Sequence, residues 1–125
     1  MDLDQIQQLV DEHLELLTVD ARGILEARER ASKFLVVQSV ISTFLRQWDE
    51  RKAKMTTIYE ATYAKACRQA LGKNITEKKI NVAEDNDYSD AREAVEVADS
   101  IRDWLKTHIK IFENAHITFR QYSKE

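Results

Sequence analysis

The side chains of this chain that could carry catalytic or metal chemistry are few and scattered. Glu113 and His116 have the Glu-x-x-His spacing that di-iron carboxylate bundles use. Such a site needs a second pair and two further glutamates, and the sequence has no second pair. The single cysteine, Cys67, lies among alanines, where we expect a small buried residue rather than a nucleophile with a neighbouring base. We therefore expect no metal, no cofactor and no catalysis.

A second group of residues has the composition of a nucleic-acid-binding surface. Residues 46–79 hold nine basic residues against four acidic ones, interleaved with Trp48, Tyr59 and Tyr63. Proteins hold single-stranded nucleic acid with cations along the phosphates and aromatic faces stacked on the bases. We predict phosphate contacts from the basic residues Lys52, Lys54, Lys65, Arg68 and Lys73, assisted by Lys78 and Lys79. Alternatively, the lysines pair with acids of a partner helix, and Trp48 and Tyr59 belong to the core.

Two acidic blocks flank this basic stretch. Residues 1–20 hold six acids and no Lys or Arg, and residues 84–99 hold seven acids against Arg92, in a chain of net charge −3. These blocks support a different function, that of a helical protein-interaction adaptor, chaperone or inhibitor that engages a basic partner. A structural component of a virion or other assembly is a third alternative.

The elements that position these residues are helices. The chain has no proline and two glycines, where average usage gives roughly six and nine, and both residues interrupt helices. We predict an all-α single domain over 1–125: a short helix at about 3–17, packed on a long antiparallel hairpin. The hairpin has two limbs, a helix at about 24–71 and a return limb at about 76–121. A hinge at 72–75 joins them. The return limb is either broken near 85–90, with Asp87 or Ser89 capping a new helix, or continuous through an irregular stretch.

Apolar residues repeat along both limbs at spacings of three and four, as in a packed helical seam. They outnumber what one thin hairpin can bury, so we also predict a homo-oligomer. The residues predicted to form the core or the oligomer contacts are Phe34, Val37, Ile41, Phe44, Leu45, Trp48, Ile101, Trp104, Leu105, Ile109, Phe112 and Phe119.

The sequence also bears on location. No apolar run approaches the 18 residues of a membrane span, and the start Met1-Asp2-Leu3-Asp4 lacks the form of a signal peptide. A single cysteine cannot form an internal disulfide. We expect no membrane association and a cytoplasmic protein, in the host cytoplasm if a phage encodes it.

The order of these features, over roughly residues 45–120, resembles the UvsY-type recombination mediators of T4-like phages. The residues that carry the resemblance are Thr76-Glu77-Lys78-Lys79 through Asp85-Asn86-Asp87, then Asp103-Trp104-Leu105, Ile109, Phe112 and Ile117.

The resemblance implies a small all-helical protein that forms a ring-like oligomer, binds single-stranded DNA and is not an enzyme. Its partners would be a recombinase, which it helps to load, and the single-stranded-DNA-binding protein that coats the strand. By position, the DNA contacts of that family resemble Lys65 and Arg68, with Lys52 and Lys54 upstream. The tyrosine pair that precedes the family's hinge is replaced here by Gln69-Ala70-Leu71, so the resemblance does not extend to a stacking role there.

Overall fold

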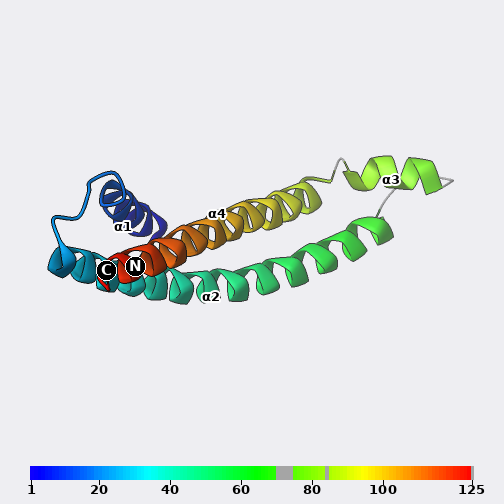
Figure 1. Ribbon diagram of the computed structural model, residues 1–125. Helices are drawn as coiled ribbons and strands as arrows, with labels where there is room; N and C mark the ends of the chain where they lie inside the picture. Colours follow the sequence, from blue (N-terminus) through cyan, green and yellow to red (C-terminus); the bar gives the residue numbers. More distant parts are fainter. Residues whose placement is uncertain (70–74, 84, 125) are drawn as a thin grey trace. The chain divides into compact units, whose positions relative to one another are not determined.

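Four helices make up almost all of the described chain. The computed structural model describes residues 1–69, 75–83 and 85–124 (Figure 1). The helices are α1 (Leu3–Glu15), α2 (Ile24–Gln69), α3 (Ile75–Ala83) and α4 (Asn86–Tyr122). No strand occurs among these residues. The predicted fold class, a short N-terminal helix packed on a long antiparallel helical hairpin, is confirmed. The predicted hinge at 72–75 lies almost wholly outside the described residues.

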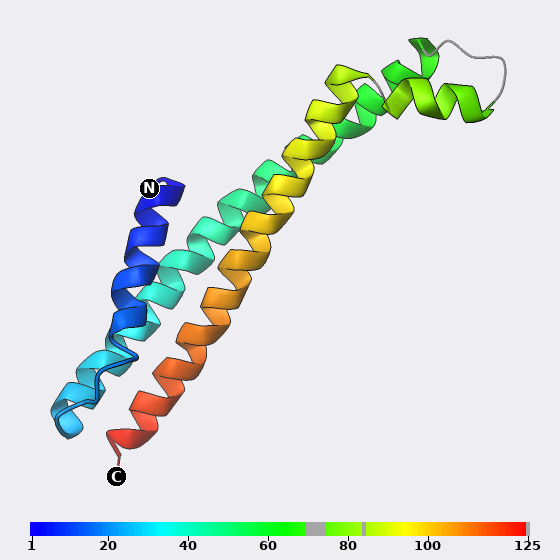
Figure 2. The same cartoon turned by 90° about the horizontal axis from the view of Figure 1, so that it is seen from above.

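The contacts within the chain fall into two units. Unit 1 consists of Met1–Arg46 and Asp103–Glu125, and unit 2 of Gln47–Arg102. Unit 1 therefore contains α1, the first half of α2 and the second half of α4. Unit 2 contains the second half of α2, α3 and the first half of α4. Within each unit the α2 and α4 segments lie side by side and run antiparallel (Figure 2).

An aromatic cluster forms the core of unit 1. The rings of Phe34 in α2 and Phe112 in α4 stack with centroids 5.8 Å apart, and both side chains are fully buried. His13 of α1 meets both rings edge-on. Ile6 and Val10, on the same helix, are also fully buried. Helix α1 thus packs its apolar stripe on α2 and α4, as an amphipathic surface helix does.

A buried arginine organises the connection from α1 to α2. The guanidinium of Arg30 donates hydrogen bonds to the carbonyls of Leu16, Val19 and Asp20, and it pairs with Glu26 at 2.7 Å. These carbonyls belong to the C-cap of α1 and to the loop that follows it, outside the hydrogen-bond pattern of the helix. The cation satisfies them, so Arg30 can be buried without losing its hydrogen bonds.

Unit 2 has a much smaller apolar core. Its buried hydrophobic side chains among the described residues are Ala66, Val82 and Ala98, all of them small. Polar and aromatic contacts join its helices instead, including a hydrogen bond between the Tyr59 and Tyr88 hydroxyls at 3.2 Å. Because large apolar side chains supply most of the burial free energy, we expect unit 2 to be less stable than unit 1.

The return limb is broken between α3 and α4. Helix α3 ends at Ala83 and α4 begins at Asn86. The Asp85 carboxylate accepts a hydrogen bond from the Tyr88 N–H at 2.9 Å, which makes Asp85 the N-cap. The prediction that Asp87 or Ser89 would be the cap is therefore wrong. Asp85 caps the helix because its side chain reaches the backbone N–H of Tyr88, the third residue of α4.

The residues predicted for the seam differ in burial. Phe34, Val37, Ile41, Phe44, Leu105 and Phe112 are buried, whereas Leu45, Trp48, Ile101, Trp104, Ile109 and Phe119 are half-buried. Cys67 is exposed, so the expectation that it is buried is wrong: its neighbour Ala66 occupies the inward position instead. None of the helices in the described ranges is long and apolar enough to span a membrane.

Candidate nucleic-acid interface

Three of the predicted DNA-contacting residues share one exposed face of α2, which we call the basic face: Lys54, Lys65 and Arg68. At 3.6 residues per turn their side chains fall within about 60° around the helix axis. All three are exposed. None of them forms an ion pair with another described residue. The basic face is thus a strip of solvated positive charge along the second half of α2.

The opposite side of the same helix faces α4. Lys52 and Tyr59 contact α4 residues, and Ala66 is buried. These three residues lie about 140° from the basic face around the axis. Packing against α4 therefore leaves the basic face uncovered within unit 2.

Lys52 differs from the basic face because it is engaged in an ion-pair network. Its ammonium nitrogen lies 2.5 Å from the Asp99 carboxylate, and Arg102 bridges Asp99 and Asp49. The hydrogen bond from Lys52 lowers the pKa of Asp99, aided by the charge of Arg102 and opposed by burial. The hydrogen bond to Asp49 raises the pKa of Arg102. Lys52 therefore holds α2 to α4 and is not part of the basic face.

The other predicted contacts lie beyond α2. Lys79, on α3, is exposed. Lys73 lies outside the described residues, and so does the side chain of Lys78.

The aromatic residues of the basic stretch are not on the basic face. Trp48 is half-buried, with the Arg51 guanidinium 4.9 Å from its ring centre. Tyr59 is half-buried and bonded to Tyr88, whereas Tyr63 is 44% exposed. The predicted interleaving of cations and stacking rings is thus absent from the basic face, so this face can offer contacts to phosphates but no ring to a base.

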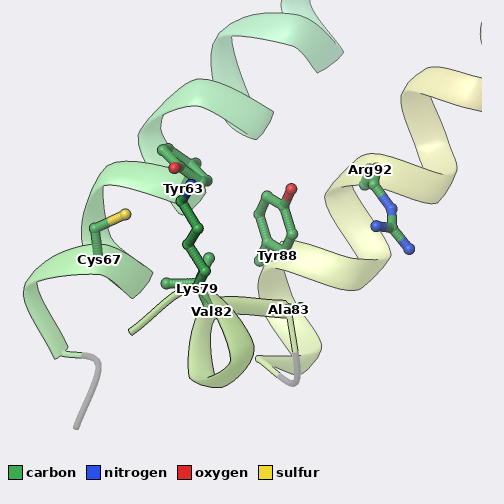
Figure 3. A pocket seen from close by; sticks show the side chains of 7 residues that line it. All are labelled: Tyr63, Cys67, Lys79, Val82, Ala83, Tyr88 and Arg92. Carbon is green, nitrogen blue, oxygen red and sulfur yellow. The ribbon is translucent and has the colours of Figure 1, made fainter. Parts of the chain in front are cut away.

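A pocket of about 390 Å³ lies beside Tyr63, where α2, α3 and α4 of unit 2 meet (Figure 3). Three of its residues with reactive, aromatic or charged side chains, Cys67, Tyr88 and Arg92, were not predicted to be functional. A sequence signal could have found Tyr88 and Arg92. They form a Tyr-x-x-x-Arg pair inside an acidic block, and a hairpin places this block opposite Tyr59 and Tyr63. The pocket is lined by Tyr63, Cys67, Lys79, Val82, Ala83, Tyr88 and Arg92.

The described residues contain no group of histidine, cysteine or acidic side chains that could hold a metal ion. Comparison with known proteins adds no relative: no family model, no curated protein and no solved structure matches this chain.

Proposed function

We propose that this protein is a non-catalytic accessory factor of DNA recombination or repair, which binds single-stranded DNA and helps to load a recombinase. The observation that carries the proposal is the basic face: Lys54, Lys65 and Arg68 are exposed and form no ion pair with a described residue. The resemblance to UvsY-type mediators supports the same function.

The chemistry of the basic face suits a phosphate backbone rather than particular bases. Ammonium and guanidinium groups neutralise phosphates and release counterions, which makes binding independent of sequence and sensitive to salt. Lys54 and Lys65 are about 16 Å apart along the helix axis at 1.5 Å per residue. A strand that follows α2 can therefore contact all three side chains.

Assembly of several copies of the chain would multiply the three positive charges of one basic face. On α2 in unit 1, the exposed residues between 32 and 43 are Ser32, Lys33, Leu35, Val36, Ser39 and Thr43. The five uncharged ones form what we call the uncharged face, and Lys33 lies at its edge. Leu35 is 50% exposed and Val36 63%. We propose that this uncharged face packs against other copies of the chain, so that several basic faces act on one strand.

A second surface supports a protein partner. Asp4, Asp11 and Glu15 are exposed on α1 and fall within about 40° around its axis, opposite the buried Ile6 and Val10. This acidic stripe suits a basic surface on the recombinase or on the single-stranded-DNA-binding protein. It equally supports the second candidate function, an adaptor or inhibitor that engages a basic protein without DNA.

Binding of a labelled oligo-dT over a salt series tests the proposal. Three phosphate contacts per subunit predict an affinity that falls about 20-fold between about 50 and 200 mM salt, and further in an oligomer. If the protein binds no oligo-dT even at the lower salt, the adaptor function replaces the proposal. An assembly that binds neither oligo-dT nor a protein partner would instead support the structural-component alternative.

A further inference from the structure

The pocket of unit 2 combines positive charge with aromatic rings. Lys79 and Arg92 supply two cations from α3 and α4. The rings of Tyr63 and Tyr88 lie with centroids 5.5 Å apart, and the Arg92 guanidinium is 5.9 Å from the Tyr88 ring centre. Figure 3 shows the Lys79 side chain extending from α3 toward Tyr63. These residues come from three helices, α2, α3 and α4, and the fold brings the three helices together.

The electrostatics of the pocket favour an anion. None of the described residues that line it is acidic. Glu96 approaches Arg92 only at 3.8 Å, and both side chains are more than half exposed, so this pair leaves the Arg92 charge largely available. A hydrogen bond with the Cys67 side chain, together with the electrostatic effect of Cys67 and burial, raises the pKa of Tyr63. The Tyr63 hydroxyl therefore stays neutral at physiological pH and adds no negative charge.

The size of the pocket limits the ligand. Pockets for small molecules span about 300 to 1,000 Å³, and this one has about 390 Å³. It suits one compact ring system rather than a dinucleotide cofactor. A ligand that matches the residues present needs a flat aromatic part for the tyrosine rings and an anionic part for Lys79 and Arg92.

We propose that the pocket takes a single nucleotide, with its base against the Tyr63 ring and its phosphate between Lys79 and Arg92. The nucleotide is either free or one unit of a DNA strand. The second form rests on the function proposed above: because Tyr63 lies about 180° from Lys54 around the axis of α2, the strand would leave the basic face and cross the helix to place one base in the pocket. It would supply the base contact that the basic face lacks.

The single cysteine allows a direct test, because Cys67 lines the pocket and is exposed. The rate of Cys67 alkylation by iodoacetamide is measured on the full chain alone and with dTMP, oligo-dT or inorganic phosphate at equal ionic strength. We expect dTMP and oligo-dT each to slow alkylation at least threefold at saturation, while phosphate leaves the rate unchanged. Protection by oligo-dT alone would assign the pocket to a strand, and protection by dTMP alone to a free nucleotide.

Two variants show whether the tyrosine ring carries the effect. Tyr63→Leu should lose the protection, expressed as the ratio of rates with and without ligand. Tyr122→Leu is the matched control, because Tyr122 is 46% exposed, similar to Tyr63 at 44%, and lies outside the pocket. Lys79→Gln should weaken dTMP binding severalfold. Circular dichroism checks that each variant keeps its helices.

The outcomes separate this inference from the proposed function. If oligo-dT binds but neither oligo-dT nor dTMP protects Cys67, the pocket is not a nucleotide site and the basic face alone accounts for binding. If dTMP protects Cys67 but oligo-dT does not bind, the pocket stands as a free-nucleotide site and the recombination function fails. Equal protection by inorganic phosphate would overturn the role of the aromatic ring.

Discussion

The Lys52 ammonium of α2 lies 2.5 Å from the Asp99 carboxylate of α4, whereas Lys54, two residues further on, is exposed. Two residues turn the side chain through about 200° around a helix. The two lysines therefore face opposite ways, one toward the partner helix and one toward solvent. This separation distinguishes the charge that holds unit 2 together from the charge available to a ligand.

Neutralising these two lysines one at a time should give opposite results. Lys54→Gln removes one phosphate contact. The slope of log affinity for oligo-dT against log salt concentration should therefore become shallower by about one, while stability is unchanged. Lys52→Gln removes the ion pair with Asp99 that joins α2 to α4, so thermal stability should fall while the salt dependence stays the same. Fluorescence anisotropy and circular dichroism measure both. A loss of DNA binding in Lys52→Gln alone would contradict this division.

Unit 2 should lose stability in acid through Asp99. Its pKa is lowered in the folded protein, chiefly by the hydrogen bond from Lys52. The ionised carboxylate therefore stabilises the fold above its ordinary pKa of about 4. This contribution is lost as the pH falls from that value through the lower pKa of the folded protein. Asp99→Asn should flatten the decline in urea midpoint between about pH 5 and pH 3. Asp103→Asn, an exposed carboxylate outside any ion pair with a described residue, is the control. Equal slopes in the wild type and Asp99→Asn would refute the linkage.

The stacked phenylalanines should dominate the stability of unit 1. Phe112 is fully buried against Phe34 and beside His13, so Phe112→Ala removes a large ring from a packed site. The free energy of unfolding should fall by about 3–5 kcal/mol, measured by chemical denaturation. Ile117→Ala, at a position 45% exposed on the same helix, should change it by less than about 1 kcal/mol. Similar losses in the two variants would show that the cluster is not the core.

The uncharged face of α2 should set the oligomeric state. Light scattering coupled to size-exclusion chromatography should give a mass that is a multiple of the 14.6 kDa chain. Replacing exposed Leu35 and Val36 with Glu would bury like charges between copies, so the double variant should be monomeric. Ser100→Glu, at an exposed position in unit 2, should keep the wild-type mass. A monomeric wild type would reject assembly.

The fold could be predicted from the sequence because two strong signals agree. The lack of proline and near lack of glycine leave few places for a helix to stop, and apolar periodicity identifies Phe34 and Phe112 as inward residues. The polar contacts could not be found in this way. Arg30 reaches carbonyls from 10 to 14 residues away, and neither periodicity nor spacing encodes which backbone atoms an arginine will meet.

The candidate site could be predicted only in part. Charge clustering identifies the basic stretch, but it cannot tell Lys52 from Lys54, because their orientation depends on which side of α2 meets α4. The alanines around Cys67 predict a small core residue there. The phase of the helix instead turns Ala66 inward and Cys67 outward. The pocket needs residues from three helices, so the pairing of α2 with α4 had to be known first.

Charge reversal on the basic face is the decisive test of whether this surface binds DNA. Lys65→Glu with Arg68→Glu should abolish oligo-dT binding at about 50 mM salt while the circular dichroism spectrum is unchanged, because both side chains are exposed. The matched control is Lys106→Glu with Arg120→Glu, one exposed lysine and one exposed arginine on α4, which changes the net charge equally. The control double variant should keep most of its affinity. Equal losses in both pairs would mean that overall charge, and not the basic face, governs binding.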